Sequence, residues 1–173
     1  MKALSSIQNP EIKKLRLLFQ KTKERKKHSL FVIEGEREIE KALKGGYLLE
    51  SVFIHKAAEH SFELIISQSK VSNVFLLASS IFERLSIRSG SEKIIAIAQS
   101  KTHKLEDLIL NESSIILVIE APEKPGNIGA IFRTAAAAKM DAVIVANPKT
   151  DLFNPNIVRS SVGCLFTNQI GIG

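Results

Sequence analysis

Apolar residues in this chain occur in two alternating patterns, short runs and stripes spaced by three or four positions. Short apolar runs bounded by polar residues are typical of strands, whereas the wider spacing places side chains on one face of a helix. The chain therefore predicts an α/β fold. The predicted strands are residues 30–34, 48–54, 73–77, 93–99, 115–121 and 142–146, and the predicted helices are residues 36–44, 57–69, 80–85, 127–139 and 157–162.

A further helix is predicted near the N-terminus. Asn9 and Pro10 are typical of an N-cap and a first helical residue, and Ile12, Leu15 and Phe19 then form an apolar stripe. We expect a short amphipathic helix, followed by a basic connecting segment over residues 21–28.

Positive charge is concentrated in this N-terminal region. Residues 1–28 carry nine Lys and Arg against two Glu, a balance of +7, whereas the remaining residues carry fifteen against sixteen. A solvated face is one reading, and an arm that neutralises phosphates is the other. A membrane-surface helix is disfavoured because the stripe is narrow and lacks Trp and Tyr. The candidate phosphate-binding cations are Lys13, Lys14, Arg16, Lys23, Arg25, Lys26 and Lys27.

The polar segment at residues 100–114 predicts a linker that holds at most a helical turn. With a boundary near residue 105, we expect a basic helix and arm (1–28), a compact α/β domain (29–104) and a second α/β domain (105–173). The uniformly apolar run at residues 115–121 suits a strand covered on both faces of a parallel sheet.

Composition excludes several classes of protein. The 173 residues are 45% hydrophobic and 24% charged, which is typical of a globular protein. No signal peptide and no membrane span of roughly 18 apolar residues is visible, so we expect a soluble, cytoplasmic protein. Cys164 is the single cysteine; it is expected to be a small buried residue, and it predicts neither a disulfide nor a metal site.

Chemistry is expected in the loop before the helix at residues 127–139, because loops at the carboxyl ends of parallel strands form ligand sites. Pro125 and Gly126 predict a tight turn into the helix. Asn127 is expected at or near the N-cap, where free N–H groups suit phosphate or carboxylate. Neither the G-x-x-x-x-G-K-[ST] phosphate loop nor G-x-G-x-x-G occurs here, so the usual nucleotide-cofactor motifs are absent.

Arg133 is predicted to face away from the core. It projects roughly 150° from the centre of the apolar arc of this helix. A solvated surface arginine is the simple reading, whereas a guanidinium beside a Gly/Pro loop also suits bidentate phosphate recognition. The neighbours on its side are small, and they allow another layer of backbone, a second subunit or a nucleic acid to approach closely: Gly129, Ala130, Ala136 and Ala137.

These residues resemble a known family. "NIGAIFRTA" (residues 127–135) matches motif 1 of the SpoU (TrmH) branch of the SPOUT RNA methyltransferases, N-x-G-A-I-x-R-T-A, and the preceding loop is similar as well. In residues 154–166, Arg159, Ser161 and Gly163 match the family's R-x-S-x-G. Residues 30–43 resemble the start of the family's L30e-like substrate-binding domain.

The resemblance implies an L30e-like domain followed by a Rossmann-like SPOUT domain with a parallel sheet. It implies methyl transfer from S-adenosylmethionine to a ribose 2′-hydroxyl of ribosomal or transfer RNA, by a homodimer with its site at the subunit interface.

Arg133 matches the family's catalytic arginine. Since a guanidinium stays protonated, we expect it to hold the phosphate beside the target ribose, while Asn127 fixes the surroundings of the hydroxyl. Arg159 and Ser161 are expected to contact RNA or a partner subunit, with capping or packing as the alternative for Ser161. The loop-shaping residues are expected to be Pro125, Gly126 and Gly129.

The family's later motifs, which hold the cofactor and form a knot, do not occur before Gly173. We therefore expect a truncated SPOUT domain without the knot, one side of its sheet uncovered, and cofactor-binding residues that cannot be assigned here. We also expect this chain to be inactive alone and less stable than a longer version. The alternative function is a non-catalytic protein that binds structured RNA; a nucleotide- or sugar-phosphate-binding domain is disfavoured by the missing phosphate-loop motifs.

Overall fold

The computed structural model of the protein describes residues 1–86 and 92–173. The chain forms two compact units, Met1–Ser100 and Lys101–Gly173, so the division falls close to the predicted boundary near residue 105. Residues 101–104 belong to the second unit because they pair with its last strand, where Ile172 N donates to His103 O at 2.8 Å. Residues 1–28 belong to the first unit.

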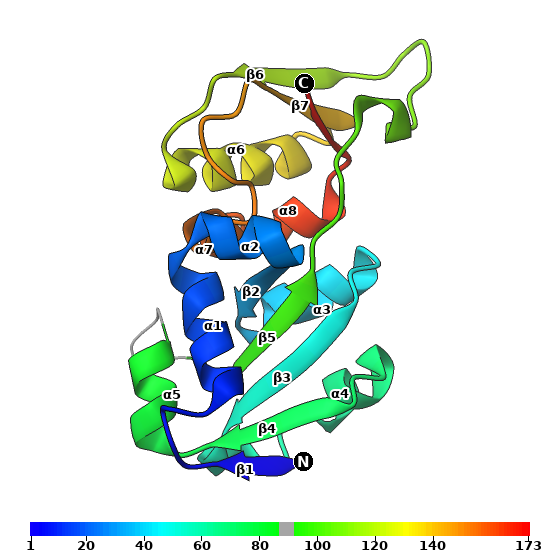
Figure 1. The fold of residues 1–173 in the computed structure, drawn as a ribbon. Coiled ribbons are helices and arrows are strands. Elements are labelled where there is room, and N and C mark those ends of the chain that lie inside the picture. Colours follow the sequence, from blue (N-terminus) through cyan, green and yellow to red (C-terminus); the bar gives the residue numbers. More distant parts are fainter. Residues whose placement is uncertain (87–91) are drawn as a thin grey trace. The chain divides into compact units, whose positions relative to one another are not determined.

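The first unit is built on a five-stranded mixed sheet in the order β1-β4-β3-β5-β2 (Figure 1). β1, β4 and β3 are parallel, and β5 runs antiparallel to both β3 and β2. The sequence predicts all of these strands except β1, a three-residue edge strand too short to show a pattern. The strands are β1 Lys2–Leu4, β2 Leu30–Glu34, β3 Leu49–His55, β4 Asn73–Leu77 and β5 Ile94–Gln99.

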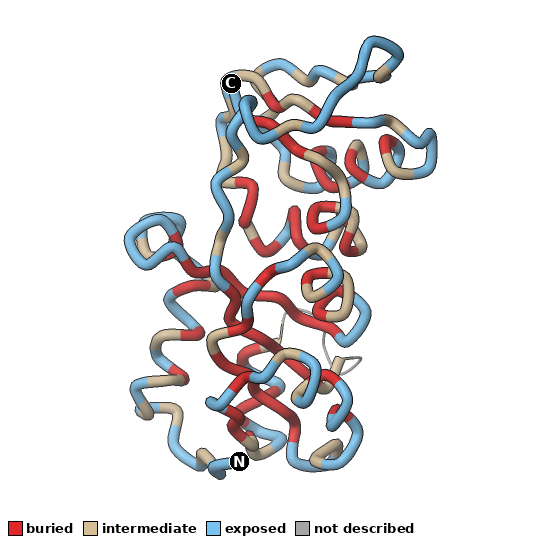
Figure 2. Tube along the Cα trace, turned by 90° about the vertical axis from the view of Figure 1, so that its right-hand side faces the viewer, coloured by how far each residue is buried: buried red, intermediate tan, exposed pale blue. Residues whose placement is uncertain are grey.

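Helices cover both faces of this sheet. α1 and α5 pack on one face, where their apolar side chains join those of the strands in a single core. α3 and α4 lie on the other face (Figure 1). Most buried residues lie in the strands, between the two layers of helices (Figure 2). The helices are α1 Pro10–Gln20, α2 Thr22–His28, α3 Glu36–Lys44, α4 Glu63–Ser69 and α5 Ser79–Leu85, with a 3₁₀ turn η1 at Lys56–Ala58.

α1 begins as its sequence predicts. The Asn9 side chain accepts a hydrogen bond from Glu11 N at 2.9 Å, and Pro10 is the first helical residue. Ile12 and Leu15 are fully buried, as the stripe predicts.

Two predicted elements of the first unit differ from the structure. The helix expected over residues 57–69 is divided into η1 and α4. Residues 21–28, expected as a connecting segment, contain α2, which ends where Ser29 adopts a left-handed φ of 52°. α2 was missed because it has no apolar stripe.

The second unit is a three-stranded, all-parallel sheet in the order β6-β7-β8, which confirms the predicted parallel sheet. α6 lies along one face, and α7 and α8 pack against α6 (Figure 1). The elements are β6 Ile116–Glu120, α6 Pro125–Ala137, β7 Ala142–Ala146, α7 Pro155–Ser160, α8 Cys164–Thr167 and β8 Ile170–Ile172, preceded by a 3₁₀ turn η2 at Leu105–Asp107.

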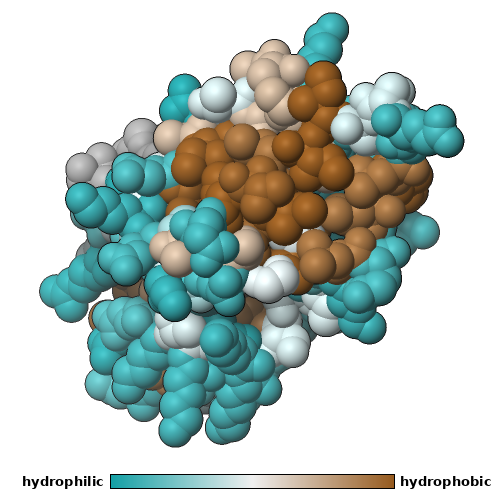
Figure 3. Space-filling model, turned by 90° about the horizontal axis from the view of Figure 1, so that it is seen from above, coloured by the Kyte–Doolittle hydropathy of each residue, from teal (hydrophilic) through white to brown (hydrophobic). Residues whose placement is uncertain are grey.

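The opposite face of this sheet is apolar and largely open. Ile116 is 38% and Val118 59% exposed, and Figure 3 shows an apolar surface there. The β8 end is covered by Leu105, since a Cβ on Gly171 would lie 2.7 Å from Leu105 Cδ2, and Ala142 of β7 is buried as well. The prediction that β6 is covered on both faces is therefore wrong, whereas the expectation of an uncovered side is confirmed.

Gly129 brings the backbones of α6 and α7 into close contact. A Cβ at Gly129 would lie 2.7 Å from Ser161 N and closer still to Ser160 Oγ. We predict that Gly129→Ala lowers the free energy of unfolding by about 1–3 kcal/mol, because the two helices must separate. Urea denaturation measures this change.

Gly126→Ala is the matched control, because a Cβ at Gly126 meets nothing within 4 Å. It should be neutral, or stabilising by up to about 1 kcal/mol. Equal denaturation midpoints for the two variants would contradict the close packing of α6 on α7.

His55 links stability to pH. Its Nδ1 accepts a hydrogen bond from Ala57 N at 3.1 Å, and the residue is 5% exposed. Burial lowers the pKa of His55, Lys93 lowers it further, and Glu83 opposes the change. Because the folded state binds this proton less readily than the unfolded state, the free energy of unfolding should fall as pH falls through about 6.5.

His55→Asn retains a side-chain acceptor for Ala57 N and does not titrate. Urea denaturation at pH 7.5 and pH 5 should give a smaller loss of stability for this variant than for the wild type. An equal loss in both proteins would show that His55 is not responsible.

Candidate functional site

The carboxyl ends of β6 and β7 form one edge of the second sheet. The residues that follow them, Ala121 and Asn147, have left-handed φ values of 45° and 47°. Such values are uncommon outside glycine, and they recur at functional sites. The edge is tied together because Ala121 N donates to Ala146 O at 2.8 Å and Asn147 Nδ2 donates to Glu120 Oε1 at 2.9 Å. Parallel strands thus present a strained, polar edge beside the start of α6.

α6 begins earlier than the sequence predicts. Lys124 is the N-cap and Pro125 the first helical residue, so Asn127 is the third residue of the helix and not its cap. Proline suits this first position because its fixed φ is helical and its missing N–H needs no partner. Pro125 and Gly126 therefore belong to the helix, where Pro125 sets its start; Gly126 borders open space, so packing does not require a glycine there.

Arg133 is exposed, which confirms the outward direction predicted from the helical wheel. Within residues 1–86 and 92–173, no carboxylate pairs with its guanidinium. Asn127 is exposed as well, about 9 Å away along the helix axis. The other exposed residues of α6 are small: Gly126, Ala130, Thr134 and Ala137. A cation and an amide are thus presented on the exposed side of α6, among small residues.

Gly129 does not lie on that open surface. It is buried against Ser160 and Ser161 of the next helical segment, and its lack of a side chain allows the backbone of that segment to pack closely against α6. Gly129 therefore allows α6 and α7 to pack together and does not have its expected role in shaping the loop.

The R-x-S-x-G segment divides into one exposed and two structural residues. Arg159 is exposed in the last turn of α7. Ser161 is 0% exposed, and its Oγ donates to Val158 O at 2.9 Å, so the alternative of packing is correct for Ser161 and RNA cannot reach it. Gly163 is buried with a φ of 82°, a conformation that favours glycine.

The basic N-terminal residues are not equivalent. Lys14 is half-buried, and its Nζ lies 2.6 Å from Glu50 Oε1. Arg25 is only 4% exposed, so its prediction as a phosphate-binding cation is wrong. The candidate cations that are exposed form what we call the basic surface of α1 and α2: Lys13, Arg16, Lys23, Lys26 and Lys27.

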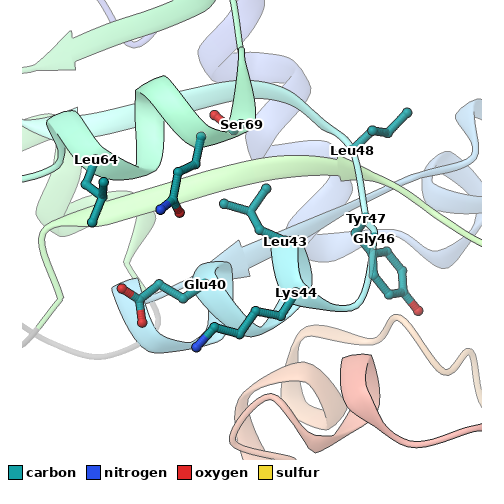
Figure 4. A pocket seen from close by; sticks show the side chains of 9 residues that line it. Glu40, Leu43, Lys44, Gly46, Tyr47, Leu48, Leu64 and Ser69 are labelled. Carbon is teal, nitrogen blue, oxygen red and sulfur yellow. The ribbon is translucent and has the colours of Figure 1, made fainter.

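Two features escaped the sequence analysis. Glu120 and Asn147 were not singled out, although each ends or directly follows an apolar run and so marks a strand end. A groove of about 550 Å³ also lies between α3 and α4 (Figure 4). Burial raises the pKa of Tyr47, which helps to line it. The groove contains none of the predicted site residues; its lining is Glu40, Leu43, Lys44, Gly46, Tyr47, Leu48, Leu64, Gln68 and Ser69.

Cys164 is half-buried with a free thiol, and so is less enclosed than expected. Among the residues that the structure describes, no three His, Cys, Asp or Glu side chains are grouped to hold a metal ion. In that same part of the chain, every helix is too short or too polar to cross a membrane.

Both units match known families. Residues 9–96 match the MRM3-like substrate binding domain, and residues 114–172 match the SpoU rRNA Methylase family. The chain is 30% identical over 166 residues to the 23S rRNA (guanosine(2553)-2'-O)-methyltransferase RlmP of Bacillus subtilis (strain 168), covering 96% of this chain and 63% of that protein.

Solved structures agree with this assignment. A crystal structure of an RNA 2'-O ribose methyltransferase matches with a TM-score of 0.81 and 33% identity, over 99% of this chain and 65% of that one. An AdoMet-bound rRNA methyltransferase from Sinorhizobium meliloti has the same fold, with a TM-score of 0.86 and 24% identity over 99% of this chain and 64% of that one.

The chain spans less than two thirds of the length of each of these proteins. Within that span, the parallel sheet and the exposed Arg133 fall inside the residues that match the SpoU family. The chain belongs to the proteins with an MRM3-like substrate binding domain, and its second unit is similar to the SpoU rRNA Methylase family.

Proposed function

We propose that this chain supplies the RNA-binding domain and the ribose-binding helix of an enzyme that transfers a methyl group from S-adenosylmethionine to a ribose 2′-hydroxyl of RNA. Ribosomal RNA is the substrate class named for its relatives. The observation that carries the proposal is the exposed guanidinium of Arg133, which has no carboxylate partner within the described residues.

Ribose chemistry explains why a cation is needed there. A 2′-hydroxyl is a poor nucleophile, so an enzyme must align it with the methyl donor and assist the loss of its proton. The cationic side chain of Arg133 would act by holding the adjacent phosphate and stabilising the developing alkoxide. Asn127 lies on the same open surface of α6, where its amide can bind the ribose or its phosphate.

The edge of the second sheet at the carboxyl ends of β6 and β7 is polar and exposed. Glu120 and Asn147 are exposed there and hydrogen-bond to each other. An open edge of this kind does not enclose an adenosine and a sulfonium, so we assign no cofactor contact to this chain. Its assigned residues act on the RNA.

The proposal includes two features that the relatives' names do not state. One is a homodimer, supported by the small residues on the open surface of α6, which permit close approach of a second subunit. The other is a cytoplasmic location, supported by the proposed RNA substrate.

A non-catalytic RNA-binding protein is the second candidate. The basic surface of α1 and α2 favours it, because that surface lies in the first unit and needs no catalytic group. It would bind phosphates of structured RNA whether or not methyl transfer follows.

We predict that Arg133→Ala lowers kcat for methyl transfer by about 10²–10³, the usual effect of removing one group that stabilises developing charge. The assay follows labelled methyl transfer to ribosomal RNA by the full-length protein. Arg133→Lys should restore part of the rate, since it retains the charge but not the planar fork.

Lys139→Gln is the matched control, because it removes an exposed positive charge just beyond the other end of α6. It should leave kcat unchanged. Full activity of Arg133→Ala would contradict a catalytic role for Arg133. RNA binding by the wild type without methyl transfer would favour the second candidate function.

The basic surface makes a separate prediction. Replacing Lys23, Lys26 and Lys27 together with Gln should reduce the slope of log K against log salt for RNA binding by about 2, or roughly 0.7 per lost phosphate contact. Fluorescence anisotropy with a ribosomal RNA fragment measures this slope. Lys56→Gln, an exposed lysine on η1, should leave it unchanged, and an unaltered slope in the triple variant would rule out phosphate contacts by α2.

A further inference from the structure

α2 is a short helix that its own sequence stabilises only weakly. It has seven residues, TKERKKH, and isolated helices shorter than roughly 12–15 residues are marginal in water. Lys23 and Lys27 are separated by four positions, a spacing at which like charges repel. His28 and Glu24 approach to 3.5 Å, but the pair is charged only when the histidine is protonated. Tertiary contacts must therefore hold α2 in place.

Arg25 provides those contacts, since it is the only buried residue of α2. Its Nη1 donates to Leu18 O at 2.7 Å and to Phe19 O at 3.3 Å, and its Nη2 donates to Thr22 Oγ1 at 2.9 Å. Leu18 and Phe19 lie in the last turn of α1, where carbonyl groups lack helical partners and a positive charge is favourable. Arg25 thus caps α1 from within α2.

The direction of Arg25 determines which way the lysines point. At about 100° per residue, Lys23 and Lys27 lie about 160° around the helix from Arg25, and Lys26 lies about 100° away. All three are exposed. If Arg25 points into the unit, the lysines must point out of it.

We propose that Arg25 is a positioning residue for RNA binding: by capping α1 it holds α2 as a preformed helix that presents Lys23, Lys26 and Lys27 to RNA phosphates. This inference rests on the proposed RNA-binding function. Preforming the helix means that its backbone entropy is lost on folding and not on binding, so each phosphate contact contributes more to affinity. Arg25 itself does not contact phosphate.

The test compares Arg25→Met with Lys23→Gln/Lys27→Gln, and it combines amide hydrogen exchange with RNA binding at several salt concentrations. Arg25→Met should reduce protection of amides 22–28 by at least about tenfold, the scale of a lost charge-assisted hydrogen bond. It should also weaken binding of a ribosomal RNA fragment while leaving the salt slope unchanged. The lysine variant should lower the salt slope without reducing amide protection, which should stay the same or rise slightly because the repulsion between Lys23 and Lys27 is removed.

Two milder variants keep the test valid if Arg25→Met fails to fold. Thr22→Ala removes only the acceptor of Nη2, so it should reduce protection and affinity in the same direction by less. Arg25→Lys retains one charged donor and should recover part of both quantities.

Three outcomes would overturn the inference. A reduced salt slope with normal amide protection in Arg25→Met would make Arg25 a direct phosphate contact. Lost protection with normal RNA affinity would mean that α2 does not present the phosphate-binding lysines. No RNA binding by the wild type would overturn it together with the proposed RNA-binding function, whereas the first two outcomes leave that function standing.

Discussion

The contact between α6 and α7 at Gly129 is the constraint on which the second unit depends. Because the backbone of α7 occupies the place of a side chain there, α6 can rotate very little about its axis. Ile128 and Phe132 are then fully buried, and Arg133 is held on the opposite, open surface. The direction of the guanidinium therefore follows from helix packing and needs no partner of its own.

The same packing places α6 beside a strained sheet edge. Ala121 and Asn147 adopt left-handed conformations directly after adjacent parallel strands, and Glu120 is bonded to Asn147 across that edge. Strain of this kind persists only where surrounding structure maintains it. Here the ladder between β6 and β7 maintains it, which leaves a rigid polar edge next to the first turn of α6.

Cations in this protein have three distinct environments, although the sequence presents them alike. Arg133 is exposed, Lys14 is paired with Glu50, and Arg25 is buried against the carbonyls of α1. Only exposed cations can exchange counterions for RNA phosphates. The net charge of +6 therefore does not reveal which cations are available for binding. In our proposal, the buried Arg25 orders the exposed lysines of α2.

Local patterns in the sequence determined most strands, the N-cap at Asn9 and the outward direction of Arg133. These features depend on periodicity and on neighbours a few residues away, and both are present within a single helix or strand. The start of α6 at Pro125, the burial of Arg25 and Ser161, and the open face beside Val118 were decided only by the tertiary structure. Each depends on which distant element packs against the residue. An arginine or a serine can interact equally well with solvent, a carbonyl group or a phosphate, so its partner cannot be predicted from the sequence alone.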